Sequence, residues 1–149
     1  MSILKILTIP EPSLRQKSAA IKPAEILKLK PLILNMIETM REAEGVGLAA
    51  PQVDKNIRLA IINQDAAPDS SDWILINPKI TKHSWKRLKD EEGCLSIPGA
   101  QKKISRFAKI TIKALDAKGQ PLNFQAEALF ARVIQHEIDH LDGILIVDK

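Results

Sequence analysis

The residues best suited to chemistry are two histidines near the end of the chain. His136 and His140 stand four positions apart in a stretch with helical periodicity. This spacing puts both imidazoles on one helix face, where they can reach a single cation. Glu137 lies next to that face, close enough to take a proton from a water held in the cation's open position. The pattern favours a metal-dependent hydrolase over an amphipathic helix whose histidines only pack against neighbours.

A catalytic metal site needs three protein ligands and one open position. Proteases with an HExxH helix take the third ligand from downstream, but the residues after His140 include neither His nor Glu. The upstream candidates are Cys94, His83 or a carboxylate. Cys94 leads, because a thiolate beside a divalent cation is deprotonated outright. The alternative for a lone cysteine is a buried, inert thiol.

The segment Gly45–Gln52 is a further candidate for a binding element. Its two glycines on either side of Val46 permit close approach of a ligand or another strand, and the amide of Gln52 can donate hydrogen bonds. The spacing does not match a dinucleotide or phosphate loop, so no phosphate site is predicted. Taken alone, the segment would be a helix terminator that leads into a turn.

Composition sets limits on the class of protein. The 149 residues have a net charge of +4, with 45% hydrophobic residues, which predicts one globular domain over residues 1–149. Basic residues alternate with acidic ones and aromatic residues are few, so we expect no specific nucleic-acid partner. Cys94 is the only cysteine, which excludes an internal disulfide. Neither a signal peptide nor a membrane span is indicated, so we expect a soluble, intracellular protein.

The hydrophobic pattern predicts a helix that begins at Pro31 and ends at Gly45, with a core-facing stripe that includes Met36 and Met40. A second helix is predicted from Glu127 to Asp142-Gly143. The predicted strands are 57–62, 73–76, 109–113, 122–126 and 144–147. We therefore expect an α+β fold, with a mostly antiparallel sheet around the C-terminal metal-binding HExxH helix and the N-terminal helix packed on the sheet.

Three segments resemble the peptide deformylases in order and approximate spacing. They are Gly45–Gln52 (GVGLAAPQ), Glu92–Ser96 (EGCLS) and Gln135–Leu141 (QHEIDHL). The resemblance covers nearly the whole chain and extends to Ile9–Arg15, Met36–Met40, Ala114–Asp116 and Gly119. Three long motifs in register are far more specific than HExxH alone.

This resemblance implies removal of the formyl group from the N-formylmethionine of new polypeptides by a mononuclear metal centre. The implied metal ligands are Cys94, His136 and His140, and the implied general base is Glu137. The implied oxyanion donors are Gln52 and the backbone N–H of Leu95. The implied substrate-binding residues are Val46, Gly47, Gly93, Leu129 and Val133. Glu92 is similar to a family position that pairs with an arginine, here Arg106, in a supporting role.

The resemblance also implies one divalent metal ion per chain, with ferrous iron favoured, while two imidazoles and a thiolate suit zinc, nickel or cobalt as well. The expected partners are N-formylmethionyl nascent peptides, in the cytoplasm and near the ribosome. A membrane partner is not expected, and a monomer is favoured. Two alternatives stay open: an HExxH peptidase that cuts internal bonds, and a non-catalytic relative that binds formylated termini.

A departure from the family pattern occurs at the start of the second predicted helix. Ala128 stands where relatives commonly carry Gly at the start of the histidine-bearing helix. Helix propensity favours Ala over Gly by up to about 1 kcal/mol. We therefore expect Ala128 to support the start of this helix.

Overall fold

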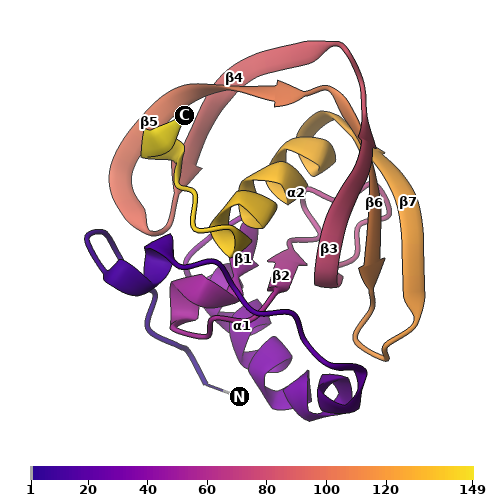
Figure 1. Ribbon diagram of the computed structural model, residues 1–149. Coiled ribbons are helices and arrows are strands. Elements are labelled where there is room, and N and C mark those ends of the chain that lie inside the picture. Colours follow the sequence, from indigo (N-terminus) through magenta and orange to yellow (C-terminus); the bar gives the residue numbers. More distant parts are fainter. Residues whose placement is uncertain (1) are drawn as a thin grey trace.

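The structure is a computed structural model that describes residues 2–149, and the paired strands of its two sheets are all antiparallel (Figure 1). A five-stranded sheet has the order β1-β2-β3-β6-β7, and β4 and β5 form a separate two-stranded sheet. The strands of the larger sheet are β1 (Gly47–Ala49), β2 (Leu59–Ile62), β3 (Trp73–His83), β6 (Lys109–Leu115) and β7 (Pro121–Glu127). The other two are β4 (Arg87–Cys94) and β5 (Ile97–Phe107).

Two α-helices accompany the sheets: α1 (Lys30–Glu42) and α2 (Ala128–Leu141). Short 3-10 helices lie at Pro12–Arg15, Pro23–Leu29, Ala50–Val53 and Ile146–Asp148. The expected mixture of helix and antiparallel sheet is confirmed, and the C-terminal helix follows the sheet in the chain. Among the described residues, no helix combines the length and apolarity needed to cross a membrane.

Helix α2 lies at the centre of the molecule, with the β4–β5 hairpin on one side and β6 and β7 on the other (Figure 1). The even-numbered positions Ile110 and Ile112 of β6 face α2 and share a core cluster with Phe130 and Ile134. This burial holds α2 to the sheet, since each fully buried side chain of this size contributes about 1.5–3 kcal/mol.

Helix α1 packs on β1 and β2 through a second cluster. Met36 and Met40 are fully buried in it, as the helical stripe predicts, together with Leu48 of β1 and Leu59 of β2. The two clusters fix β1 and α2 in place, and these two elements carry much of the site described below.

One predicted strand was wrong, and two strands were missed. The last segment, predicted as a strand over 144–147, instead includes the 3-10 helix Ile146–Asp148. The strands β4 and β5 were not predicted, because a two-stranded hairpin buries little of either face and so lacks clear apolar alternation. The charged residues of β4 up to Glu91 are exposed, and Glu92 is the first buried one.

Ala128 corrects the expectation from helix propensity. It begins α2 with a φ of 55°, in the left-handed region. A Cβ in that region costs about 1–2 kcal/mol, so the lower helix propensity of Gly does not decide this position. We expect Ala128→Gly to raise the free energy of unfolding by about 0.5–1 kcal/mol. This net gain is the relief of the left-handed strain minus the extra conformational entropy that Gly gives the unfolded chain.

Urea denaturation of the metal-free protein measures this effect. The matched control is Ala131→Gly, because Ala131 is fully buried inside the same helix. The control is expected to lose about 1 kcal/mol or more. A loss of stability in both variants would show that the left-handed geometry does not strain Ala128.

Candidate metal centre and pocket

Three potential ligand atoms from two distant parts of the chain converge beside α2. The ligand atoms of Cys94, His136 and His140 all lie within 4.8 Å of one another. His140 Nε2 is 3.3 Å from Cys94 Sγ and 3.2 Å from His136 Nε2. Cys94 comes from the end of β4, and one helix turn separates the two histidines. His83, the other candidate for third ligand, stacks on Phe107 at the exposed end of β3, outside this cluster.

These spacings fit a tetrahedral metal site. For zinc-like bond lengths, the edges of a tetrahedron are about 3.4 Å between two nitrogens and about 3.6 Å between nitrogen and sulfur. The two measured separations lie within a few tenths of an ångström of these edges. One thiolate and two imidazoles are also the donor set that divalent first-row metals accept. The residues therefore fit one divalent cation, although its identity does not follow from them.

A buried carboxylate orients one of the histidines. Glu92 Oε1 lies 2.9 Å from His136 Nδ1. A proton on Nδ1 is donated to this oxygen, so Nε2 is the ring nitrogen that can bind a cation together with Cys94 and His140. Arg106 donates to both oxygens of Glu92, at 2.8 and 2.9 Å, and to Asp139 at 2.5 Å. Arg132 donates to Glu92 Oε2 at 2.6 Å. Glu92, His136, Asp139 and the two arginines are called the Glu92 network below.

Burial and charge set the protonation of these groups. Burial acts to raise the pKa of Glu92, but Arg106 and His136 hold it well below its usual range. Burial opposes charge on His136, yet hydrogen bonds to Cys94 and Glu92 raise its pKa to about 10. Burial and the charge of His136 hold the pKa of His140 well below its usual value. Because ligand imidazoles are neutral, a cation entering here would release the proton of His136.

Glu137 is buried next to the cluster without a neutralising partner. It is 3% exposed, and its Oε1 has no hydrogen-bond partner among the described residues. Burial raises its pKa to about 7, although His136 and Arg106 act in the opposite direction. A carboxylate with a pKa near neutrality can both accept and return a proton at physiological pH.

Gln52 lies on the other side of Cys94. Its Oε1 accepts a hydrogen bond from the Ala49 amide at 2.9 Å, which fixes Nε2 toward the site. Nε2 donates to Ser96 Oγ at 3.1 Å and lies 4.0 Å from Cys94 Sγ. Leu95 stands between Cys94 and Ser96, in the turn that joins β4 to β5. The two predicted oxyanion donors thus flank the cysteine.

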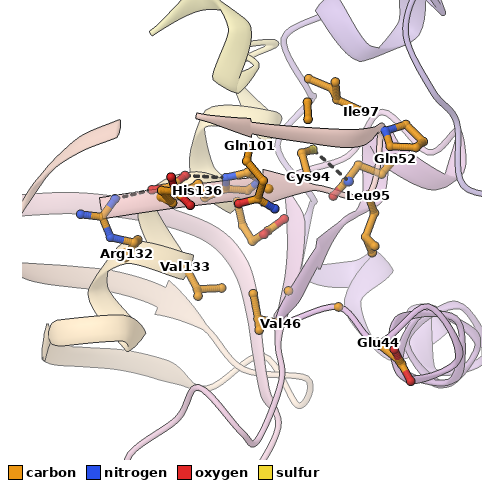
Figure 2. Close-up of a pocket in the computed structure, with 18 of the residues that line it drawn as sticks. Glu44, Val46, Gln52, Cys94, Leu95, Ile97, Gln101, Arg132, Val133 and His136 are labelled. Carbon is orange, nitrogen blue, oxygen red and sulfur yellow. Dashed lines mark hydrogen bonds and ion pairs between the residues drawn. The ribbon is translucent and has the colours of Figure 1, made fainter. Parts of the chain in front are cut away.

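A pocket of about 570 Å³ lies beside the cluster (Figure 2), and its lining includes Gln52, Cys94, Leu95, His136 and Glu137. Val46 and Leu129 are both about half exposed at the pocket, while Val133 is buried in its wall. Figure 2 shows Val46 and Val133 beside each other, with Arg132 and His136 together at one end. The lining includes every predicted substrate-binding residue: Val46, Gly47, Gly93, Leu129 and Val133.

The structure adds three residues that the sequence analysis did not single out for the site. Ser96 holds the Gln52 amide, Asp139 binds Arg106, and Arg132 binds Glu92. Arg132 also donates to the backbone carbonyls of Leu88 and Ile104, which ties α2 to β4 and β5. Its sequence signal was the spacing: Arg132 stands four residues before His136 and therefore shares its helix face.

Comparison with known proteins gives consistent results. A sequence model of the family "Polypeptide deformylase" matches residues 3–149. The peptide deformylase of Psychrobacter arcticus is 43% identical over 148 residues, covering 99% of this chain and 79% of the relative. The peptide deformylase of Halothermothrix orenii is 44% identical over 151 residues, covering 100% of this chain and 94% of the relative.

Solved structures agree with this. A class I type b peptide deformylase from Acinetobacter baumannii superposes with a TM-score of 0.95 at 32% identity, with full coverage of both chains. The enzyme from Thermotoga maritima superposes with a TM-score of 0.91 at 36% identity, covering 99% of this chain and 97% of that one. Fold and site therefore define a hydrolytic enzyme of a metal-dependent class. Within that class, the chain belongs to the polypeptide deformylase family.

Gly47 leaves the space that Glu137 occupies. A Cβ at this position would lie 2.7 Å from Glu137 Oε2 and 2.9 Å from Val133 Cγ1. We expect Gly47→Ala to displace the carboxylate and to lower kcat on formyl peptides by about 10²-fold, the cost of misplacing a reacting group by about 1 Å. Steady-state kinetics measure this, and an unchanged kcat would show that the carboxylate position is not critical.

Proposed function

We propose that residues 1–149 form one catalytic domain that removes the formyl group from the N-formylmethionine of newly synthesised polypeptides in the cytoplasm. The observation that carries this is the convergence of Cys94, His136 and His140 beside a buried carboxylate and an apolar pocket. Family membership supports the same activity. Ferrous iron is our first choice of metal, with zinc, nickel or cobalt as alternatives.

Cys94, His136 and His140 would hold the cation in this reaction. When bound, a divalent cation supplies a Lewis acid that acidifies a water molecule and polarises the formyl carbonyl. Glu137 accepts a proton from the attacking water and then passes it to the departing amine. Its burial and its pKa near 7 suit both steps.

Gln52 and Leu95 stabilise the negative charge that develops on the formyl oxygen. The Gln52 amide has two N–H groups, and Ser96 accepts only one of them. The second N–H and the backbone N–H of Leu95 serve as oxyanion donors. Each such donor contributes about 3 kcal/mol in acyl-transfer enzymes. Because Oε1 of Gln52 is already bound to Ala49, little reorientation is needed during the reaction.

The substrate enters as an extended peptide. Val46, Leu129 and Val133 accept the methionine side chain, and unbranched apolar side chains suit such a pocket. β1 is an edge strand of the larger sheet, so the backbone near Gly47 can pair with the substrate on its free side, with Gly93 across from it. Main-chain hydrogen bonds do not depend on the identity of the side chains, so the site accepts many different residues after the methionine.

Release of formate from formyl-Met-Ala-Ser tests the proposal directly. The protein is prepared anaerobically with iron, and the peptide with an acetyl group in place of formyl is the control substrate. We expect formate release from the first peptide and little cleavage of the second. Cleavage of internal bonds in blocked peptides would instead indicate a peptidase, and binding without turnover would indicate a non-catalytic relative.

A further inference from the structure

The segment over residues 2–9, called the N-terminal arm below, runs close to the site although none of its residues lines the pocket. It belongs to no helix or strand, and Figure 1 shows it in indigo beside the lower end of the β4–β5 hairpin. Two of its backbone N–H groups bind segments of the site. The Leu7 amide donates to the Gln52 carbonyl at 2.7 Å, and the Ile9 amide donates to the Ser96 carbonyl at 3.0 Å.

The two acceptor carbonyls belong to the segments that carry the oxyanion donors. Gln52 supplies its side-chain amide, and Ser96 directly follows Leu95, whose backbone N–H is the second donor. In the described part of the chain, no backbone hydrogen bond joins residues 50–53 directly to residues 94–98. A direct hydrogen bond joins their side chains, from Gln52 Nε2 to Ser96 Oγ at 3.1 Å. The N-terminal arm therefore closes a ring of hydrogen bonds that includes both donor segments.

The N-terminal arm is itself fixed at both ends. At its start, the Leu4 amide donates to Thr39 Oγ1 of α1 at 2.8 Å, and the Leu4 side chain packs on the α1 cluster. Just beyond its end, Leu14 is fully buried in a cluster that includes residues of β5. The side chains of Leu7 and Cys94 both pack against that same cluster. A segment held at both ends restrains the carbonyls that its N–H groups bind.

Burial of side chains does not by itself explain the path of the N-terminal arm. Ile9 is 40% exposed, so much of its side chain stays in water, yet its N–H donates to Ser96. Thr8, between the two donors, is exposed as well. Oxyanion donors are effective because they are fixed before the negative charge develops. The backbone contacts of the N-terminal arm supply such fixation.

We propose that the N-terminal arm positions the two oxyanion donors, with the Leu7 N–H holding Gln52 and the Ile9 N–H holding Leu95 and Ser96. This inference rests on the proposed function, because it assigns a support to the donors of that reaction. Leu7 and Ile9 are positioning residues, since neither lines the pocket. They act through backbone N–H groups, so this contribution does not depend on the identity of their side chains.

The exchange of Leu7 for its α-hydroxy acid, Leu7→leucic acid, tests the first bond in a full-length chain made by ligating a synthetic N-terminal segment. The resulting ester has an oxygen in place of the N–H and keeps the side chain. The Ile6 carbonyl, which becomes an ester carbonyl, accepts no hydrogen bond among residues 2–149, so only the bond to Gln52 is lost.

We expect the Leu7 ester to lower kcat on formyl-Met-Ala-Ser about tenfold, a part of the roughly 10²–10³-fold that loss of a whole oxyanion donor costs. KM should stay within about twofold of the wild-type value, because the oxyanion exists only in the transition state. Steady-state kinetics measure both constants. An unchanged kcat would overturn the proposal.

The matched control is the same exchange at Thr8, which stands between the two donors. Neither the Thr8 N–H nor the Leu7 carbonyl takes part in a hydrogen bond among residues 2–149. The control is expected to keep the wild-type kcat. Equal losses in the two variants would overturn the proposal, because the bond to Gln52 would then not matter. If the Leu7 ester failed to fold, the exchange at Ile9 would test the bond to Ser96 in the same way.

A double-mutant cycle with Gln52→Ala separates positioning of the donor from a general loosening of the fold. If the N-terminal arm acts through the Gln52 amide, the Leu7 ester should change kcat by less than about twofold once that amide is removed. The same loss in both backgrounds would show that Leu7 supports the fold rather than the donor, and the proposal would be wrong.

NMR of the zinc-loaded protein without substrate gives a readout that does not depend on turnover. We expect the side-chain amide signals of Gln52 to shift in the Leu7 ester and to stay in place in the Thr8 ester. Unmoved signals in the Leu7 ester would overturn the inference whether or not the protein deformylates. Absence of formate release by the wild-type protein would overturn the proposed function, while the shift of the Gln52 signals would still show that the N-terminal arm positions this amide.

Discussion

Replacing Glu137 with Gln is expected to lower kcat on formyl-Met peptides by about 10²–10⁴-fold while metal stays bound. Gln has nearly the same shape as Glu but cannot accept the proton of the attacking water. Glu137 is not one of the three converging ligand residues, so the metal content should not change. Elemental analysis and steady-state kinetics of the same preparation measure both properties.

The matched control for this substitution is Glu42→Gln. Glu42 is an exposed carboxylate at the end of α1 and does not line the pocket. It is expected to leave kcat and metal content as they are. If Glu137→Gln turned over substrate within tenfold of the wild-type rate, another group would have to be the base. A large loss of metal in that variant would instead indicate that Glu137 acts mainly by holding the site together.

Local patterns made α2 and the β6–β7 hairpin predictable. The histidine spacing and the apolar stripe of α2 both repeat with helical period, and Gly143, with a φ of 75°, ends the helix as expected. In β6, the alternation of lysine and isoleucine marks one buried and one exposed face. These features depend on residues close in sequence, so they can be recognised without knowing the fold.

The remaining features depend on contacts between distant segments. Arg132 lies beside Glu92 only because the β4–β5 hairpin, which buries little apolar surface, folds against α2. The sequence also does not show that Lys79 and Lys113 are neighbours, because strand register decides which charged residues lie opposite each other. Ala128 is strained by a backbone angle that propensity does not describe. Only the three-dimensional arrangement reveals these features.

The Glu92 network is the structural feature whose disruption we expect to cost most stability. Replacing Arg106 with Leu should lower the free energy of unfolding by about 3–5 kcal/mol. Arg106 is 3% exposed and is the one cation that binds both Glu92 and Asp139. Without it, two carboxylates stay near one another, with Arg132 and the protonated His136 left on Glu92 and the partly exposed Lys149 left on Asp139. For a protein of ordinary stability this is a large share of the total.

Urea denaturation of the metal-free protein measures the loss, with Arg15→Leu as the matched control. Arg15 also pairs with a carboxylate, Asp148, but both side chains are more than a third exposed. An exposed pair contributes only about 0–1 kcal/mol, so the control should change little. Equal losses in the two variants would show that burial of the Glu92 network does not raise the cost of breaking it.

The same variant separates stability from metal binding. Glu92 keeps its hydrogen bond to His136 and its contact with Arg132 when Arg106 is removed, so it is less firmly positioned but still present. Loss of such outer support typically lowers metal affinity by about 10–100-fold. Competition with a chelator measures this at a temperature where the variant is folded. Wild-type affinity in that assay would mean that Arg132 alone suffices to hold Glu92 on His136, and that Arg106 serves the fold rather than the metal.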